Sequence, residues 1–345
     1  MANPLTALLI GTAIIGLCIF IFWPGSGMVA RWKSRKSTTQ RALMENALKH
    51  LYNCEYESVN CSIETLAGNL SISSDEATLL LTRLEAMGLV STSEENLKLN
   101  NDGRSYALRI IRVHRLWEKY LADETSVEEL EWHASAEEIE HKLSPAEADV
   151  LAAQIGNPVF DPHGDPIPTS DGKIPGRRGK PLNDLKMGEF ANIIHIEDEP
   201  NAIYTQLVAQ GLYPGMQVRL IESSDKRIRF TANGEDCTLA PLFAKNVTVT
   251  SIKSEKIIEG KLKKLSSLKV GEKGIVVGIS KACRGQQRRR LMDMGVVPGT
   301  EIVNEMKSAG GDPIAYRIKE ATVALRIKQA ERIYLVPDEE IEKNV

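Results

Sequence analysis

The sequence has few cysteines, and they are irregularly spaced. Five occur in 345 residues, at positions 18, 54, 61, 237 and 283. Disulfide frameworks and cysteine-only zinc sites need regularly paired cysteines, so both are excluded, and a reducing compartment is favoured. The sequence also lacks a glycine-rich phosphate loop, a serine–histidine–aspartate order and a pair of carboxylates suited to acid–base catalysis. We therefore predict that the protein is not an enzyme.

Net charge is also small, a formal −3, but it is unevenly divided. Residues 1–44 hold five basic and no acidic side chains, whereas the remainder holds 38 basic and 46 acidic ones. Polyanions are bound through an excess of positive charge, so this acidic remainder argues against general coating of nucleic acid. The length and the 42% hydrophobic content predict a globular protein of about two to four domains.

One long run without charge occurs, the 19 residues from Leu5 to Trp23. Such a run is long enough to cross a bilayer as a helix. No positive charge precedes it, which argues against a secretory signal peptide, and five basic residues follow. Positive charges tend to stay in the cytoplasm. We therefore predict a transmembrane anchor over residues 1–30 and a single-pass location in the cell inner membrane, with the soluble domains cytoplasmic. A buried hairpin and a cleaved leader are the alternatives.

Four further segments follow. Residues 40–103 predict three short helices and then a hairpin of two alternating runs around residues 94–96, which is the order of a winged helix-turn-helix. Residues 104–155 predict a helical domain with helices at 104–121 and 126–154. Residues 156–181 are rich in proline and glycine and predict a linker.

An internal repeat fills the rest of the chain. The stretch from Leu182 to Gly188 recurs from Leu265 to Gly271, and both copies continue with short alternating strands. Two small β-barrels, over residues 182–254 and 264–338, fit this pattern best.

Histidines and carboxylates recur at helical spacing in the predicted helical domain. Four lie at i, i+4, i+7 and i+8 and share one helix face, and the preceding helix carries another pair at i and i+4. Their donors suit Mn²⁺, Fe²⁺, Co²⁺ or Zn²⁺. The alternative is chance, because a glutamate-rich helix often carries such pairs on its surface. The residues are His133, Glu137, Glu140 and His141, with His114 and Glu118.

Residues 40–155 resemble the diphtheria-toxin-repressor family of metal-dependent regulators, including its manganese branch. The stretches that carry the resemblance are 47–52, 113–118, 137–141 and 156–168, and the two repeats look like FeoA-type SH3-like barrels. The resemblance implies a winged helix-turn-helix, a helical dimerisation domain and two SH3-like (FeoA-type) β-barrels. With the transmembrane helix indicated by the uncharged run, the expected fold class is α+β multidomain.

The family implies two metal sites. Glu137, Glu140 and His141 fall on its primary site, and Asn46 aligns with its first-helix ligand. His114, Glu118 and His133 fall on its ancillary site. Glutamate rather than cysteine at position 137 favours Mn²⁺, so the expected cofactor is Mn²⁺ or Fe²⁺, with other divalent transition metals as alternatives.

Other residues near these sites received different interpretations. Lys49 stands where the manganese branch has glutamate, and we expect it to act as a counter-charge to Glu137 or Glu140. Glu199 lies near the place where the first barrel lends an ancillary ligand. His163 is interpreted as structural or solvated.

The predicted recognition helix carries few basic residues. Asp75 and Glu76 near its start repel phosphate. Leu79, Leu80, Leu81 and Leu84 are interpreted as core. The candidate DNA-contacting residues are Ser74, Thr78, Arg83 and, on the wing, Lys98.

These observations lead to two functional hypotheses. The first is a membrane-tethered, metal-dependent transcriptional repressor of metal-ion homeostasis, a homodimer whose partner is operator DNA. The second is a membrane-associated metal sensor or metal-transport accessory protein, which docks on a transporter through its FeoA-type domains without binding specific DNA.

Overall fold

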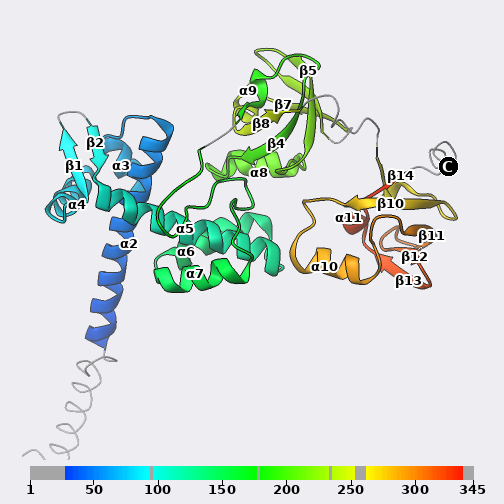
Figure 1. The fold of residues 1–345 in the computed structure, drawn as a ribbon, viewed down its shortest axis with the longest axis horizontal. Coiled ribbons are helices and arrows are strands. Elements are labelled where there is room, and N and C mark those ends of the chain that lie inside the picture. The colour runs from blue at the N-terminus through cyan, green and yellow to red at the C-terminus, as the bar shows by residue number, and fades with distance from the viewer. Residues whose placement is uncertain (1–27, 94–95, 177–178, 233–234, 253–261, 337–345) are drawn as a thin grey trace, which may run out of the picture. The chain divides into compact units, whose positions relative to one another are not determined.

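The structure, a computed structural model, describes residues 28–93, 96–176, 179–232, 235–252 and 262–336. It separates into two compact units (Figure 1). The first unit comprises Met1–Arg112 and Glu138–Leu143, and the second comprises Val113–Glu137 and Ser144–Val345.

The first unit contains a helix-turn-helix and a two-stranded wing. Its elements are α2 (Met28–Glu57), α3 (Ile63–Leu70), α4 (Ser74–Ala86), β1 (Val90–Ser93) and β2 (Asn96–Leu99), followed by the start of α5 (Asn101–Glu124). The strands pair antiparallel. Ser62 and Ser73 begin α3 and α4 as N-caps, each in a capping box that satisfies free backbone N–H groups. The predicted order of helices and hairpin is confirmed.

The predicted helix over residues 126–154 is wrong. The structure has a 3₁₀ turn, η1 (Glu129–Glu131), and then two helices, α6 (Trp132–Glu140) and α7 (Pro145–Gln154). The break has a local cause, because a residue before proline avoids helical backbone angles and Pro145 occupies the first turn of α7. The Ser144 side chain accepts a hydrogen bond from the backbone N–H of Glu147 and so caps the new helix.

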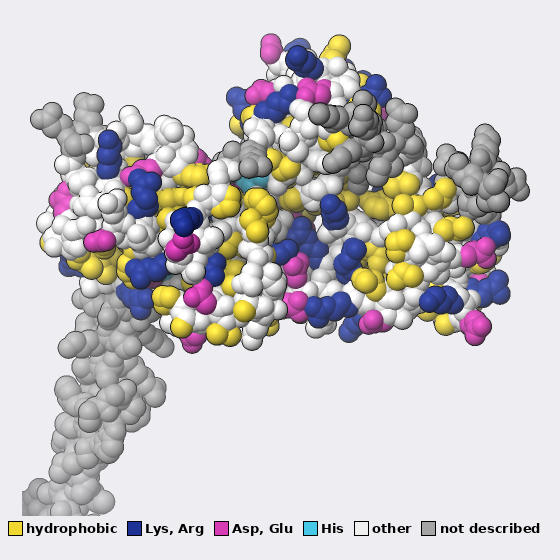
Figure 2. All heavy atoms as spheres, in the orientation of Figure 1, with side chains coloured by type: hydrophobic (Ala, Val, Ile, Leu, Met, Phe, Trp, Pro, Cys, Tyr) yellow, Lys and Arg dark blue, Asp and Glu magenta, His cyan; other side chains and the backbone are white. Residues whose placement is uncertain are grey.

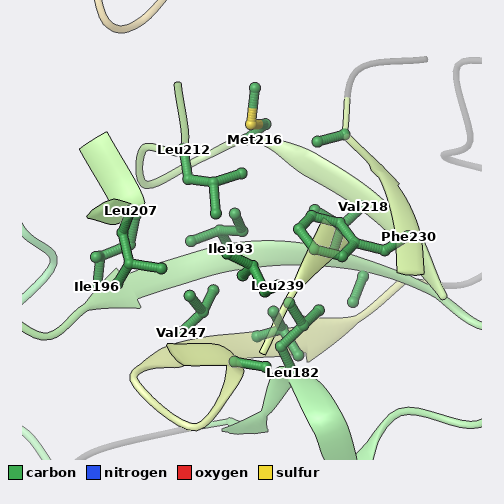
Figure 3. Close-up of a cluster of buried hydrophobic side chains, with 14 of the residues drawn as sticks. Leu182, Ile193, Ile196, Leu207, Leu212, Met216, Val218, Phe230, Leu239 and Val247 are labelled. Atoms are coloured by element: carbon green, nitrogen blue, oxygen red, sulfur yellow. The ribbon is translucent and has the colours of Figure 1, made fainter. Parts of the chain in front are cut away.

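Each sequence repeat forms a six-stranded antiparallel sheet with its own core. The first sheet has the order β3-β8-β4-β5-β6-β7, and the second has the order β13-β12-β11-β10-β14-β9. Figure 3 shows the first core, in which Ile193, Phe230 and Val247 are fully buried. The elements of the first repeat are β3 (Lys180–Pro181), η2 (Leu182–Asp184), β4 (Phe190–Ile196), α8 (Asn201–Ala209), β5 (Gln217–Ser223), β6 (Ile228–Ala232), β7 (Glu235–Leu239), α9 (Pro241–Ala244) and β8 (Val247–Ser251). Those of the second are β9 (Lys263–Lys264), η4 (Leu265–Ser267), β10 (Lys273–Ile279), α10 (Gly285–Asp293), β11 (Glu301–Lys307), β12 (Ile314–Ile318), β13 (Ala321–Leu325), α11 (Ile327–Ala330) and β14 (Ile333–Val336).

The predicted transmembrane helix is not supported. Within the described part of the chain, every helix is too short or too polar to cross a membrane. This finding corrects the transmembrane component of the expected fold and, with it, the expected location in the inner membrane. The predicted anchor, residues 1–30, falls almost entirely outside the described residues.

Candidate metal centre

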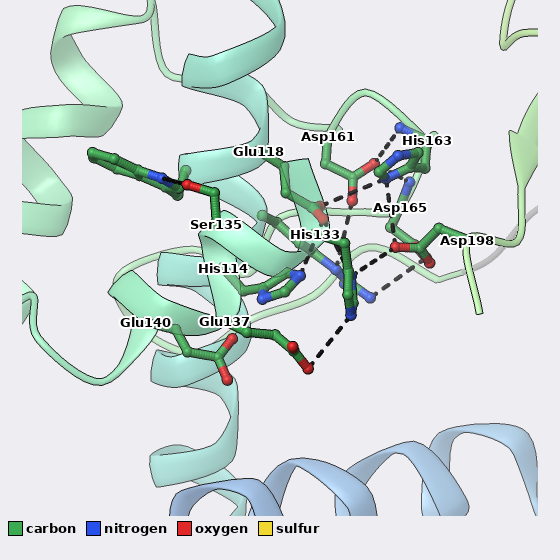
Figure 4. Close-up of polar contacts among 12 residues, drawn as sticks. His114, Glu118, His133, Ser135, Glu137, Glu140, Asp161, His163, Asp165 and Asp198 are labelled. Carbon is green, nitrogen blue, oxygen red and sulfur yellow. Dashed lines mark hydrogen bonds and ion pairs between the residues drawn. The ribbon is translucent and has the colours of Figure 1, made fainter. Parts of the chain in front are cut away.

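Side chains of α5 and α6 converge around Glu118 in the second unit. His114 lies one helical turn before Glu118, so the two share a face of α5. Nε2 of His114 lies 3.1 Å from Oε1 of Glu118, and Nδ1 of His133 lies 3.4 Å from the same oxygen (Figure 4). The structure thus brings together three of the predicted metal ligands, with donor atoms all within 4.8 Å of one another.

The linker and the first repeat contribute three further side chains. Nδ1 of His163 lies 3.6 Å from Oε2 of Glu118 and 3.8 Å from Oδ2 of Asp198. Asp198 Oδ2 also lies 3.1 Å from Nδ1 of His133, whose Nε2 lies 3.1 Å from Oε1 of Glu199. We refer to the six residues as the Glu118 cluster: His114, Glu118, His133, His163, Asp198 and Glu199.

Glu137 stands at the edge of this cluster. Its Oε1 lies 3.6 Å from Nε2 of His133, one turn earlier on α6, and its side chain is 56% exposed. The predicted ligand Glu137 therefore contacts an ancillary-site histidine within the second unit.

The centre of the Glu118 cluster is buried, and the cluster is strongly charged. Glu118 is 1% exposed and His163 is 3% exposed. Burial alone lowers the pKa of His163, but the carboxylates of Glu118 and Asp198 outweigh it and raise that pKa to about 10. His133 follows the same balance, with burial outweighed by Asp198 and Glu118, so its pKa is also raised. The carboxylates of the cluster thus stabilise protonated imidazoles beside them, and a bound cation would neutralise the same negative charge.

Opposing effects also act on Glu118 itself. Burial raises the pKa of its carboxyl group, but His114 and His163 overcome that effect and hold the pKa well below its usual value. Glu118 is therefore an anion at neutral pH, the form in which a carboxylate binds a metal ion.

A tight turn in the predicted linker positions His163. Asp161 Oδ1 accepts hydrogen bonds from three successive backbone N–H groups, those of residues 163, 164 and 165, at 2.8–2.9 Å. Arg115 of α5 lies 3.9 Å from Asp161 Oδ2. Gly164 has φ +98°, and a Cβ there would lie 2.0 Å from the carbonyl oxygen of Ile194. This part of the segment is therefore fixed in place rather than loose.

A second cluster lies in the first unit and centres on Glu45 of α2. Glu45 Oε2 lies 2.6 Å from Nδ1 of His141, while Oε1 accepts hydrogen bonds from Arg41 and Tyr106, both at 2.7 Å. Glu45 is 2% exposed, and burial alone raises its pKa, but these hydrogen bonds outweigh burial and lower it. Glu45 therefore makes the contact from α2 to His141. The predicted ligand Asn46 is the next residue along the helix, and its side chain is half-buried.

Lys49 completes this cluster. Its Nζ lies 3.1 Å from Oε2 of Glu140 and 3.5 Å from Oε1, and Glu140 is 3% exposed. Nε2 of His141 lies 3.7 Å from Oε1 of Glu140. The expected role of Lys49 as a counter-charge is confirmed for Glu140. A lysine ammonium thus already compensates one of the predicted primary-site carboxylates.

Sequence reasoning missed three residues of these clusters. Glu45 is adjacent to Asn46 and Asp198 is adjacent to Glu199, so in each case the family resemblance pointed to the neighbouring residue. His163 lies within the 156–168 stretch that carried the resemblance but was interpreted as structural or solvated. Only the tertiary structure places it against Glu118.

The candidate DNA-contacting residues are solvent-exposed. Ser74, Thr78 and Arg83 are exposed on α4, and Lys98 is exposed on β2. Leu79 is 54% exposed, so its assignment to the core is wrong, whereas the other three leucines are buried. On the face drawn in Figure 2, basic and acidic side chains are interspersed and form no single basic surface.

Comparison with known proteins matches three parts of the chain to domain families. Residues 100–169 match the iron dependent repressor, metal binding and dimerisation domain. Residues 180–251 and 263–337 each match the FeoA domain.

Individual relatives extend these matches. The chain is 38% identical over 89 residues to a probable metal transport system membrane protein of Chlamydia trachomatis, a match that covers 26% of this chain and only 20% of that protein. It is 26% identical over 225 residues to the diphtheria toxin repressor of Corynebacterium diphtheriae, covering 60% of this chain and 96% of the repressor. Among solved structures, a manganese-dependent transcriptional repressor in complex with manganese is 26% identical, with a TM-score of 0.56, and the match covers 61% of this chain and all of that one. The chain is therefore similar to iron- and manganese-dependent repressors, including the diphtheria toxin repressor, over about 60% of its length, and two further segments match the FeoA domain.

Proposed function

We propose that the protein is a metal-dependent transcriptional regulator that binds operator DNA as a homodimer and represses genes of metal-ion homeostasis. The observation that carries this proposal is the Glu118 cluster, in which imidazoles and carboxylates converge from α5, α6, the linker and the first repeat around the buried side chains of His114, Glu118 and His163. Similarity to an iron-dependent repressor of Mycobacterium leprae and to a manganese-dependent transcriptional repressor supports the same conclusion.

The donor set of the Glu118 cluster fits the predicted cofactor, Mn²⁺ or Fe²⁺. Imidazole nitrogens and carboxylate oxygens suit these ions, and no thiol lies among the six residues. Within the described residues, neither ring nitrogen of buried His163 makes a close hydrogen bond, and Nδ1 faces Glu118 and Asp198 at 3.6 and 3.8 Å, so it can bind an ion once the ion displaces its proton. His114, Glu118, His133 and Asp198 would hold the ion, which supplies the positive charge that protonated imidazoles now provide. Glu199 and His163 complete the set.

The cluster in the first unit has a different proposed role. There, Arg41 pairs with Glu45 and Lys49 pairs with Glu140, and the Tyr106 hydroxyl donates a hydrogen bond to Glu45. A metal ion at this cluster would therefore have less negative charge to neutralise. We assign the metal-dependent step to the Glu118 cluster and treat the predicted ligands Asn46, Glu140 and His141 of the first unit as a weakened site.

DNA binding is assigned to α4 and the wing. Ser74, Thr78, Arg83 and Lys98 are exposed there and offer hydroxyl and cationic groups to bases and phosphates. The repressor relatives and the order of helices and hairpin support this assignment.

Electrophoretic mobility shift of the protein on its own upstream DNA, with and without Mn²⁺, tests the proposal. At about 0.1 M salt we expect a shift that requires Mn²⁺. Glu118→Gln should abolish the Mn²⁺-dependent shift. The control is Glu222→Gln, which removes an ion pair between Glu222 on β5 and Arg227 at the protein surface and should leave the shift intact. Absence of a metal-dependent shift in the unmodified protein contradicts the proposal.

A second candidate is a metal sensor or accessory protein of a metal-transport system that acts through its FeoA domains without specific DNA binding. The match to a protein described as a probable metal transport system membrane protein supports it, as do Asp75 and Glu76 at the start of α4. Mn²⁺ binding in calorimetry without any DNA shift would favour this candidate over the repressor.

A further inference from the structure

The first unit contains a sulfur-rich group of side chains that the proposed function does not use. His50 and Cys54 lie one turn apart on α2, and Cys61 lies just before the N-cap of α3. One candidate ligand atom from each residue lies within 4.8 Å of the other two. Cys61 is 2% exposed, while His50 and Cys54 are partly exposed.

The fold brings these residues together through a tight reversal after α2. Ser58 adopts a left-handed conformation with φ 59°, and the N–H of Val59 donates to the carbonyl of Cys54 at 2.8 Å. Cys61 is held from the other side, because its carbonyl accepts a hydrogen bond from the N–H of Leu97 in β2. The three side chains are thus positioned by helix, turn and wing before any ligand binds.

We propose that His50, Cys54 and Cys61 form a binding site for a thiophilic cation of the zinc class, chemically distinct from the Glu118 cluster. Two thiolates and an imidazole are ligands that such ions prefer, whereas Mn²⁺ prefers harder oxygen donors.

The observed spacing fits such an ion. Nε2 of His50 lies 3.6 Å from Sγ of Cys54. Zinc bonds of about 2.0–2.1 Å to nitrogen and about 2.3 Å to sulfur, at a tetrahedral angle, place these two atoms about 3.5 Å apart. The ion therefore needs little rearrangement of α2, and three protein ligands leave a fourth position for water.

Metal binding at these thiols needs no oxidant. The ion displaces the thiol protons: each S–H bond breaks as a sulfur–metal bond forms, and the proton leaves to solvent.

Binding at this site ties the end of α2 to the start of α3, the first helix of the helix-turn-helix. This link would stabilise the DNA-binding unit only when a thiophilic cation is bound, whereas the Glu118 cluster binds a harder cation such as Mn²⁺. The regulator then carries two sites that different metals fill.

Cobalt titration of the full chain, reduced and freed of metal, tests the proposal. Thiolate–Co²⁺ bonds give a charge-transfer absorption in the near ultraviolet, which the sulfur-free Glu118 cluster cannot produce. We expect the saturated band to correspond to one thiolate-bound Co²⁺ per chain, reached at up to about two equivalents of added Co²⁺ because the Glu118 cluster also takes this ion, and to disappear when Zn²⁺ displaces Co²⁺. Cys61→Ser should remove or strongly weaken the band, and Cys237→Ser, in β7 of the first repeat, should leave it unchanged.

His50→Gln covers the case in which Cys61→Ser does not fold, because it keeps both thiols. Loss of a direct ligand should weaken Co²⁺ binding at least as much as loss of an outer hydrogen-bond partner does, about 10–100-fold. Absence of the sulfur band in the reduced protein, or an undiminished band in both the Cys61 and His50 variants, overturns the proposal. A Cys54–Cys61 disulfide in protein purified under air, with no band after reduction, also overturns it.

Discussion

Nζ of Lys49 lies 3.1 Å from Oε2 of Glu140, a carboxylate that is almost completely buried. Both residues belong to the first unit, Lys49 on α2 and Glu140 at the end of α6. The resemblance implies a metal ion beside Glu140, so here a side chain of the protein supplies positive charge to that carboxylate. This pair therefore links α2 to α6 without a cofactor.

Removing the ammonium should destabilise the protein even without metal. Lys49→Ala leaves Glu140 buried without its counter-charge, which should cost about 1–3 kcal/mol of unfolding free energy. Urea denaturation measured with and without EDTA detects the loss. Lys142→Ala is the matched control: Lys142 pairs with Glu138, both side chains are more than half exposed, and the change should be within about 1 kcal/mol. Equal effects of the two substitutions would refute the assigned role of Lys49.

Exchanging the sign of the charge at position 49 should convert the first-unit cluster into a metal site. Lys49→Glu places a third carboxylate near Glu45 and Glu140, and such a group is stabilised only when a cation neutralises it. We expect the Mn²⁺ stoichiometry measured by calorimetry to rise from about one to about two ions per chain. Lys49→Gln removes the charge without adding a ligand and should give an intermediate or unchanged stoichiometry. A stoichiometry of two in the unmodified protein would contradict this view of the cluster.

Asp198 should matter for metal binding although it lies just after β4 of the first repeat. It is mostly buried, with a side chain 14% exposed, and its carboxylate contacts both His133 and His163. Asp198→Asn should weaken Mn²⁺ binding at least as much as loss of an outer hydrogen-bond partner does, about 10–100-fold. Glu199→Gln should cost less, because the Glu199 side chain is 55% exposed. Asp236→Asn, exposed on β7, is the control and should leave the calorimetric affinity unchanged.

Local sequence signals predicted the helices and hairpin of the first unit and the His114–Glu118 pair because these depend on short-range spacing, whereas the family resemblance grouped His133 with that pair. Residues one turn apart share a helix face whatever else the chain does. The positions of His163 and Asp198 depend instead on how a turn near residue 161 packs beside β4, and no local pattern encodes that contact. The break before α7 did have a local signal, the N-cap and proline pair Ser144–Pro145. The acidic residues on both sides of this pair favoured a single continuous helix instead.

The turn that carries His163 gives the last prediction. Gly164→Ala combines two effects: an alanine at φ +98° is strained, and its Cβ would lie 2.0 Å from the carbonyl oxygen of Ile194. The turn must shift to relieve this clash, and His163 moves with it, so Mn²⁺ affinity should fall together with stability. Gly188→Ala separates the two effects, because Gly188 has φ +78° but a Cβ there meets no atom within 4 Å. That substitution should cost about 1 kcal/mol or somewhat more in unfolding free energy and leave Mn²⁺ affinity unchanged. If both variants lose Mn²⁺ affinity equally, or neither does, the turn at Gly164 does not position His163 for the metal.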